Sequence, residues 1–279
     1  MSIKIVTDST CDLPQQVIKD LDITVVPLYI NIGDKGYLDG VDISRVEFYT
    51  NLPNYEVHPT TATPSIETFK KTFKELADNG ATEIISIHIS ESLSATVKIA
   101  ESAAKEFKQI PVAVHDSQQL SMGTGFQVEL AAKLARKGYP TEKIIAALND
   151  LMERTFVTAG LDTLEFLRRS GRMNVFLAGI GSLLQLKPIL TMKKGRPDSE
   201  KVRTTKKATS RIIEMLKEYL PIERFALLHT NAQEKAKAFR KQVADLIPVS
   251  EVFSMDITPV IGAHIGPGAV GYAVVSKKT

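Results

Sequence analysis

Three glycines near the C-terminal end of the chain carry the spacing of a nucleotide-binding loop. Gly266, Gly268 and Gly271 lie in the stretch GAHIGPGAVGYAVV as G-x-G-x-x-G. A dinucleotide fingerprint opens a helix and needs an acidic residue about 20 positions later. Here only eight residues follow Gly271, and YAVV predicts a strand. The glycines therefore predict a turn in which the backbone approaches another group closely, with the titratable side chain of His264 beside it.

Loops rich in hydroxyl groups and poor in charge follow three predicted strands. They read TDSTCDLP, ISESLSAT and DSQQLSMGTG. Because loops at the carboxyl ends of parallel strands form the ligand crevice, we expect a site here that uses neutral hydrogen-bond donors. Residue type alone favours structural roles, with Thr61 as an ordinary loop hydroxyl before a helix and Ser94 as a helix cap.

Other chemistries lack their motifs. The histidines at 58, 88, 115, 229 and 264 are scattered without H-E-x-x-H, and we expect no metal and no cofactor. The sequence has neither the P-loop pattern nor G-x-S-x-G. Cys11 is a single thiol without an adjacent histidine, so we expect it to be inert. Arg172 ends the run RRSGR, which by itself indicates a solvated helix end.

The N-terminal half alternates strands with helices, which is the pattern of a parallel sheet. Short β-branched runs predict buried strands at residues 3–6, 23–30, 83–88 and 112–115. Helical spacing of apolar residues predicts helices at 64–80, 95–107, 125–138 and 141–154. Thr63 before Pro64 predicts the cap of the first of these helices, and Gly80 its end.

A second unit is predicted to begin near residue 155. Strand patterns at 155–161, 185–193, 225–230, 251–257 and 271–275 are separated by helical segments. We predict an α/β fold of two α/β domains, residues 1–154 with a mainly parallel sheet and residues 155–279, smaller, with a mixed sheet. The basic stretch from Lys193 to Arg211 has no aromatic residue and predicts a solvated face, with docking onto an acidic partner as the alternative.

Composition narrows the class of protein. A hydrophobic fraction of 43%, a charged fraction of 24% and a net charge of +3 are ordinary for a globular protein and give no general attraction to nucleic acid. With one cysteine and an N-terminus that lacks a basic head and an apolar run, we expect a cytoplasmic protein. The long uncharged segment 257–276 contains prolines and glycines, so we predict no transmembrane segment.

Eight segments recur in the order and spacing of one known family. They are VTDSTCDLP, YLDGVDIS, TTATPS, ISESLSAT, DSQQLSMGTG, LEFLRRSGR, GSLLQLKPIL and VIGAHIGPGAVG. On these segments the chain resembles the DegV family of bacterial fatty-acid-binding proteins along its whole length. Each segment alone is weak evidence, whereas the ordered set is specific.

The resemblance implies a protein that holds one long-chain fatty acid in a tunnel between or beneath two α/β domains. Proteins of this kind serve as the acyl-carrying subunit of a bacterial fatty acid kinase. A separate ATP-binding subunit, similar to dihydroxyacetone kinase, phosphorylates the bound carboxylate to an acyl phosphate for phospholipid synthesis. On this reading the chain has no activity of its own, and its contact with a membrane is at most transient.

The resemblance also implies site residues. Thr61 and Ser94 match the residues that bind the carboxylate, and Arg172 and His264 match basic residues near the head group. FLAGIGSLL at 176–184 is our candidate for lining the tail. Two other readings stay open: a stand-alone esterase or thioesterase using Ser94 or Ser117 with His264, and a small-molecule sensor that docks through its basic stretch.

Overall fold

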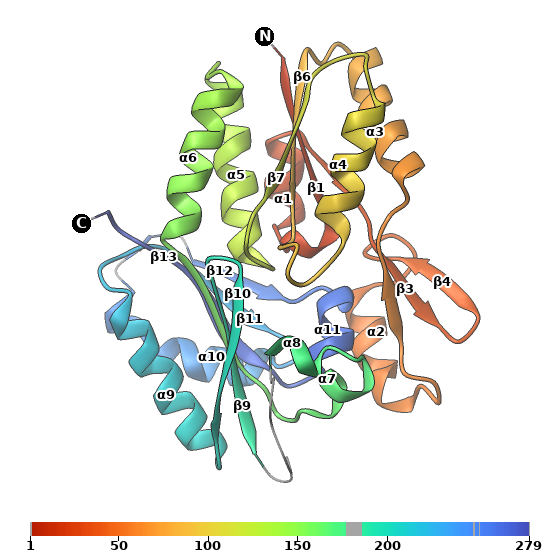
Figure 1. Cartoon of the computed structure of the whole chain (residues 1–279). Helices are drawn as coiled ribbons and strands as arrows, with labels where there is room; N and C mark the ends of the chain where they lie inside the picture. The colour runs from red at the N-terminus through yellow and green to blue at the C-terminus, as the bar shows by residue number, and fades with distance from the viewer. Residues whose placement is uncertain (1, 177–185, 248, 251, 279) are drawn as a thin grey trace.

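Two β-sheets stacked end to end organise the chain (Figure 1). The computed structural model describes residues 2–176, 186–247, 249–250 and 252–278. The α/β class, with an N-terminal parallel sheet and a C-terminal mixed sheet, is confirmed. The proposed tail-lining segment FLAGIGSLL lies, apart from its first residue, outside the described residues.

The upper sheet has four parallel strands in the order β2-β1-β6-β7. These strands are β1 (Ile3–Asp8), β2 (Ile23–Val26), β6 (Glu83–His88) and β7 (Val112–Asp116). The helices that accompany them are α1 (Gln15–Asp20), α3 (Ile66–Asp78), α4 (Thr96–Glu106), α5 (Met122–Arg136) and α6 (Thr141–Glu153). α3 and α4 pack on one face of the sheet, while α5 and α6 pack on the other, because alternate strand residues point to opposite faces.

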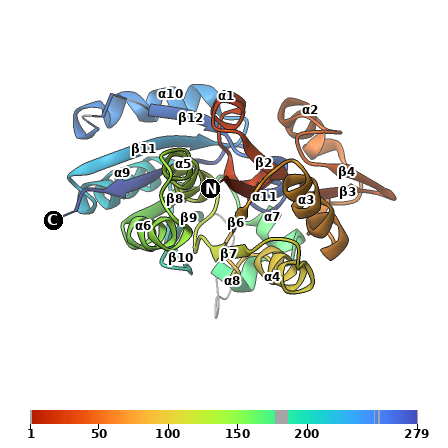
Figure 2. The ribbon, with the colours of Figure 1, turned by 90° about the horizontal axis from the view of Figure 1, so that it is seen from above.

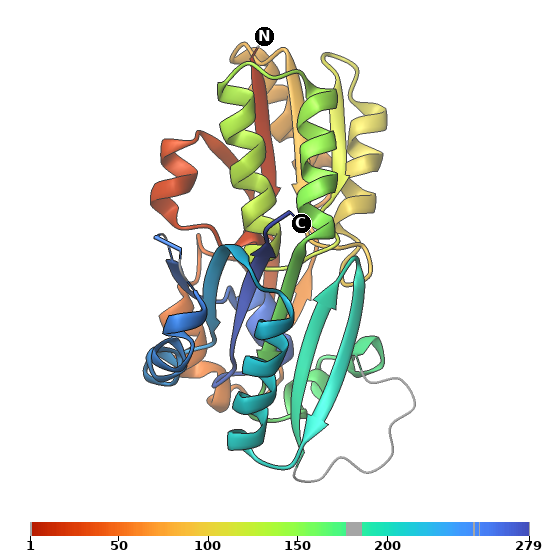
Figure 3. The same ribbon diagram turned by 90° about the vertical axis from the view of Figure 1, so that its left-hand side faces the viewer.

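The lower sheet has six strands in the order β10-β9-β8-β13-β11-β12, of which only β11 and β12 pair in parallel. They are β8 (Thr155–Gly160), β9 (Lys187–Lys193), β10 (Arg196–Val202), β11 (Ile222–His229), β12 (Val252–Asp256) and β13 (Val270–Ser276). Helices α9 (Thr205–Glu218) and α10 (Gln233–Gln242) cover its outer face (Figure 3).

A small third sheet interrupts the first half of the chain. It contains β3 (Tyr29–Ile32), β4 (Lys35–Leu38) and β5 (Thr60–Ala62) and is accompanied by α2 (Arg45–Asn51). The prediction of one strand over 23–30 was wrong, because Pro27 separates β2 from β3 and the two strands join different sheets. Seen from above, β3, β4 and α2 lie at the edge of the molecule opposite the C-terminus (Figure 2).

The third sheet packs on a helix from the far end of the sequence. Phe48 and Tyr49 of α2 share a buried cluster with Val260 and Ala263 of α11 (Pro259–Ile265). Short helical elements complete the described chain: η1 (Ser9–Cys11), η2 (Leu52–Asn54), α7 (Glu165–Arg169), α8 (Met173–Phe176) and η3 (Ala244–Leu246). The excursion from residue 29 to 62 therefore connects the N-terminal half to the C-terminal helix α11.

One hydrophobic core extends across both large sheets. Ile85 and Ile87 of β6, Phe126 of α5 and Val157 and Ala273 of the lower sheet belong to the same buried cluster. Along β13 the side chains alternate between this shared core and the cluster under α9 and α10. The two sheets are thus held in a fixed arrangement, and the space between them is largely apolar.

Several local predictions differ from the structure. The predicted cap Thr63 is not the cap of α3, since Ser65 accepts a hydrogen bond from the backbone N–H of Thr68. The charged segment 196–202 forms strand β10, which the sequence pattern did not predict. Within the described part of the chain, no helix is long and apolar enough to cross a bilayer.

Candidate functional site

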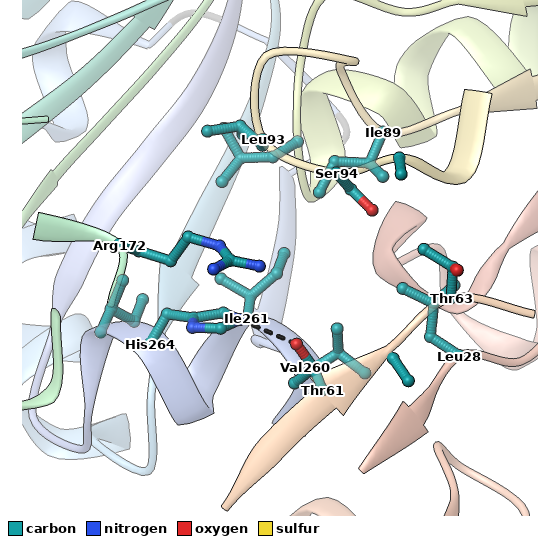
Figure 4. Close-up of a pocket in the computed structure, with 14 residues that line it drawn as sticks. Leu28, Thr61, Thr63, Ile89, Leu93, Ser94, Arg172, Val260, Ile261 and His264 are labelled. Carbon is teal, nitrogen blue, oxygen red and sulfur yellow. Dashed lines mark hydrogen bonds between the residues drawn. The ribbon is translucent and has the colours of Figure 1, made fainter. Parts of the chain in front are cut away.

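A cavity of about 360 Å³ lies where the upper sheet, the third sheet and α11 meet (Figure 4). We call it the site cavity. Its polar lining residues include Thr61, Ser94, Arg172 and His264, which are the residues that the sequence analysis singled out. Its apolar lining comes from Leu28, Ala62, Ile89, Leu93, Ala95, Leu120, Val260, Ile261 and Ile265.

Thr61 occupies the short strand β5, where it pairs with Ile30 of β3. Strand alternation turns its side chain away from that of Thr60, which is exposed. Its Oγ1 lies 3.1 Å from Nε2 of His264, and both residues line the cavity (Figure 4). Two residues separated by 203 positions are therefore brought into direct contact.

Ser94 lies in the loop between β6 and α4, on the opposite side of the cavity from Thr61 (Figure 4). Its Oγ accepts a hydrogen bond from the Thr96 N–H at 3.3 Å and lies 2.8 Å from the Thr96 hydroxyl. The loop is fixed at its start, because the Ile89 N–H donates to Oδ2 of the buried Asp8 at 3.1 Å. The hydroxyl is thus presented by an ordered turn.

Arg172 follows the turn that ends α7. Gly171 adopts a left-handed conformation with φ of 71°, which suits glycine because it lacks a Cβ. The Arg172 N–H donates to the Leu167 carbonyl at 3.1 Å, and the guanidinium points into the cavity (Figure 4). Among the described residues this guanidinium has no carboxylate partner. A cation that faces a cavity without a counter-charge favours an anionic group there.

His264 lies in the last turn of α11, directly before a turn that contains Gly266 and Gly268, as the sequence predicted. Its Nδ1 is buried and has no hydrogen-bond partner among the described residues. Burial, reinforced by the nearby charges of Arg172 and His58, lowers the pKa of His264 to about 4. The ring is therefore neutral at pH 7 in the empty cavity, where one cation is already present.

The glycines on either side of His264 are required by close packing. A Cβ on Gly262 would lie 2.1 Å from the Tyr49 hydroxyl oxygen, and one on Gly266 would lie 2.2 Å from the Phe166 ring. They allow α11 to approach α2 and α7 closely. Val270 then begins strand β13, so the expectation that these glycines lead into a strand is confirmed.

A smaller apolar cavity of about 40 Å³ adjoins the site cavity. The two share Leu120, Ile261 and Ile265 in their linings. The second is otherwise lined mainly by side chains of the lower sheet and its edges, namely Val157, Ala159, Leu161, Leu190, Thr191, Met192 and Leu228. It lies in the shared core between the two large sheets.

Two of the three predicted hydroxyl loops contribute to the site cavity. Ser94 and Leu120 come from the loops after β6 and β7. The first loop, TDSTCDLP, does not line it; its residues hold neighbouring segments in place. Leu28, just before β3, and the apolar lining residues of α11 escaped prediction, because nothing in the local sequence separates a cavity wall from an ordinary core.

The arrangement lacks the geometry of a serine hydrolase. Among the described residues no hydrogen bond joins His264 to Ser94, and no carboxylate orients the ring through Nδ1. Ser117 is buried and bonded to Thr124 and the Gln119 carbonyl. In the described ranges, no cluster of three or more histidine, cysteine or acidic residues is placed to hold a metal ion.

Comparisons with known proteins agree with this architecture. The family model described as "Uncharacterised protein, DegV family" matches residues 2–277. The chain belongs to the DegV family. A DegV domain-containing protein of Listeria innocua is 37% identical over 273 residues, covering 96% of each chain.

Solved structures of the DegV family share the whole fold. A Thermus thermophilus member, described for its fatty acid binding, superposes with a TM-score of 0.91 at 37% identity, covering 99% of this chain and 100% of that one. DegV of Bacillus subtilis, described as a fatty acid binding protein, has a TM-score of 0.90 at 32% identity, covering 99% and 100%.

Proposed function

We propose that this chain binds one long-chain fatty acid in the site cavity and presents its carboxylate to a separate kinase subunit. The observation that carries the proposal is the division of the cavity. Hydroxyl and cationic side chains gather around the position between Thr61, Ser94, Arg172 and His264, whereas the rest of the lining is apolar except for Thr63 and adjoins the core. The fatty acid binding of the Thermus and Bacillus relatives supports the same ligand here.

The tail supplies the affinity. Each buried methylene contributes about 0.8 kcal/mol, so a tail of about 15 methylenes yields on the order of 12 kcal/mol before ordering costs. We propose that the tail passes between Leu120, Ile261 and Ile265 into the apolar cavity, which widens to receive it. Its chain-length preference then depends on how far the core between the sheets opens.

The carboxylate loses hydration on entry, and an unpaired buried ion costs several kcal/mol. Hydroxyl donors from Thr61 and Ser94 offset this cost without adding charge. Arg172 supplies a cation near the head group, directly or through water. The bound anion also raises the pKa of His264 above its value of about 4 in the empty cavity, because an adjacent negative charge favours the protonated ring.

Because the hydroxyls of Thr61 and Ser94 are uncharged, they leave a carboxylate oxygen of the fatty acid nucleophilic and accessible to the kinase subunit. In the proposed reaction this oxygen attacks the γ-phosphorus of ATP held by a dihydroxyacetone-kinase-like subunit, ADP leaves, and an acyl phosphate forms for phospholipid synthesis. Arg172 and His264 are placed to stabilise the developing charge. The chain itself has no catalytic activity on this account, acts in the bacterial cytoplasm and meets a membrane only transiently.

Mass spectrometry of the purified protein tests the ligand. Native spectra followed by solvent extraction are expected to show one co-purified fatty acid per chain. A protein that is empty and also fails to take up added oleate or palmitate contradicts the proposal. Turnover of an ester or acyl-thioester without a partner, lost in Ser94→Ala, would instead establish the hydrolase.

The role of Arg172 is tested separately. Arg172→Ala is expected to retain extracted fatty acid while acyl phosphate formation with the kinase subunit falls, because the residue serves transfer or docking more than retention. Loss of lipid together with full activity when lipid is resupplied contradicts that assignment.

A further inference from the structure

The N-terminus of α11 is held by residues from outside the helix. Thr258 occupies the cap position, yet its side chain makes no capping hydrogen bond to the helix. Its N–H donates to Oδ1 of Asp12 at 2.9 Å, and its hydroxyl donates to Asp39. The carbonyls just before it are also bonded, Asp256 O by Arg45 and Ile257 O by the Tyr49 hydroxyl.

Asp12 joins three separate elements through one carboxylate. Besides the Thr258 N–H, it accepts from Ser121 Oγ at 2.6 Å and pairs with Arg45 at 3.0 Å. Ser121 directly follows the cavity-lining Leu120, and α11 supplies four lining residues including His264. Asp12 itself does not line the site cavity. The carboxylate thus ties two walls of that cavity to each other.

Holding this carboxylate costs the fold stability. The side chain is 1% exposed, and burial, only partly offset by Arg45, raises the pKa of Asp12 to about 6. An acid whose pKa is raised on folding is destabilising once it is ionised. A neutral side chain of the same shape would avoid that desolvation cost but would leave Arg45 without this carboxylate.

A second cavity lies beside this group. A cavity of about 260 Å³ is lined by Asp12, Asp39 and Arg45 and is separate from the site cavity. The titratable and charged groups that face Asp12 are Arg45 and Tyr49 from α2, Asp39 after β4, Asp256 at the end of β12, and Asp8 and Cys11 on its own segment. Burial also raises the pKa of Asp39, Tyr49 and Cys11.

We propose that Asp12 is a positioning residue for the lipid site: its ionised carboxylate fixes α11, and with it His264, against the loop that carries Leu120. The part concerning lipid rests on the proposed function above. Asp12 acts without touching the ligand. When it is protonated, charge-assisted hydrogen bonds to Thr258 and Arg45 become weaker, and α11 is held less firmly.

The test compares Asp12→Asn with a matched control, Glu129→Gln. Glu129 is also a buried carboxylate paired with an arginine across the two sheets, through Arg224, but it contacts neither α11 nor the site cavity. Hydrogen exchange of the α11 amides in lipid-free protein at pH 7.5 is expected to speed up about tenfold in Asp12→Asn and to stay unchanged in Glu129→Gln. Wild-type protection, corrected for intrinsic rates, is expected to fall toward pH 5, and that of Asp12→Asn to stay low throughout.

Palmitate affinity and melting temperature complete the comparison. At pH 7.5 Asp12→Asn is expected to bind palmitate about tenfold more weakly without a lower melting temperature, and Glu129→Gln to bind within about twofold of wild type. Should Asp12→Asn fail to fold, Asp12→Glu keeps the charge but displaces it, and is expected to weaken palmitate binding in the same way.

The outcomes separate the two proposals. Wild-type exchange of α11 in the folded Asp12 variant, or equal loss of affinity and stability in both variants, overturns the role of Asp12. Faster exchange of α11 in a protein whose wild type takes up no palmitate leaves the role of Asp12 intact and overturns the proposed function.

Discussion

Two histidines of this chain occupy opposite kinds of environment. His88 is fully buried, with Nδ1 2.9 Å from Asp8 and Nε2 2.7 Å from the Ser86 hydroxyl. His264 faces a cavity, and within the described ranges it has no carboxylate partner and no hydrogen bond at Nδ1. The first has the Ser-His-Asp order of a catalytic triad, and the second does not.

Access and unused bonding capacity distinguish a site from a structural network. His88 lines neither the site cavity, nor the smaller apolar cavity, nor the cavity beside Asp12. The Asp8 carboxylate already accepts hydrogen bonds from His88, Thr10 and the Ile89 N–H. Such a network stabilises the carboxyl end of the sheet. Around His264, in contrast, the part of the chain that the structure describes provides no partner for Nδ1 and no carboxylate for the Arg172 guanidinium, so both can bind a ligand.

The largest effect is expected from Asp8→Ala. Removal of this carboxylate leaves His88 and two buried N–H groups without their acceptor, which typically costs about 3–5 kcal/mol in the free energy of unfolding. Urea denaturation measures it. Glu67→Ala, which breaks an exposed pair with Lys70, is the control and is expected to cost less than about 1 kcal/mol. Equal small losses would mean that the buried network is not a stabilising one.

The stability that Asp8 contributes is expected to depend on pH. Burial alone would raise the pKa of Asp8, but the hydrogen bond and charge of His88, with Thr10 and Ile89, bring it below its ordinary value of 3.8. The stability it contributes is therefore fully present above that value and lost as the pH falls below it.

Thr61→Val is expected to weaken palmitate binding by about 10- to 100-fold, because it removes a hydrogen bond to a charged group and keeps the shape of the side chain. Thr60→Val, on the neighbouring exposed position of β5, provides the control and should bind as wild type. Titration calorimetry of lipid-free protein distinguishes them. Similar affinities for both variants would remove Thr61 from the head-group site.

Substitution of Ser86 and of Ser94 compares the buried His88 network with the site cavity. Ser86→Ala is expected to lower the free energy of unfolding by about 1–3 kcal/mol, since it leaves Nε2 of the buried His88 without a partner, and to leave palmitate affinity unchanged. Ser94→Ala is expected to do the reverse, with about tenfold weaker binding and little loss of stability. If both variants lose the same quantity, the division between network and site fails.

The smallest expected effect is the uptake of a proton by His264 when palmitate binds. Because the pKa of His264 is about 4 in the empty cavity and rises beside a bound carboxylate, palmitate binding at pH 5.5 should take up a fraction of a proton. Palmitate affinity therefore increases as the pH falls from the pKa of His264 in the complex toward 4. Calorimetry in buffers of different ionisation enthalpy is expected to show less uptake in His264→Gln than in wild type, and equal uptake would place the proton elsewhere.

The sequence predicted the sheets better than the connections between them. The strands β1 and β6 are largely buried runs rich in β-branched residues and β7 is a partly buried one, so their pattern was sufficient. The split at Pro27 and the short strand β5 depend on a third sheet whose partners lie far along the chain. The helix α11 has seven residues, with proline and glycine among them and nearly all of them buried, so no helical periodicity is visible in it.

The site residues could be named from the sequence only through the family resemblance. Thr61, Ser94, Arg172 and His264 come from four separate elements, and no local spacing links them. The resemblance did not reveal Asp12, whose importance depends on the contact between its carboxylate and Thr258, 246 residues away. A contact of that kind is defined by the folded structure, because either residue alone resembles an ordinary turn residue.

The most direct test of this account is a crystal structure with 16-bromohexadecanoic acid. The account predicts a carboxylate within hydrogen-bond distance of Thr61 and Ser94, and an anomalous bromine peak in the widened apolar cavity near Leu190 and Met192. A bromine peak at the mouth beside Arg172, or a ligand outside the site cavity, would contradict it.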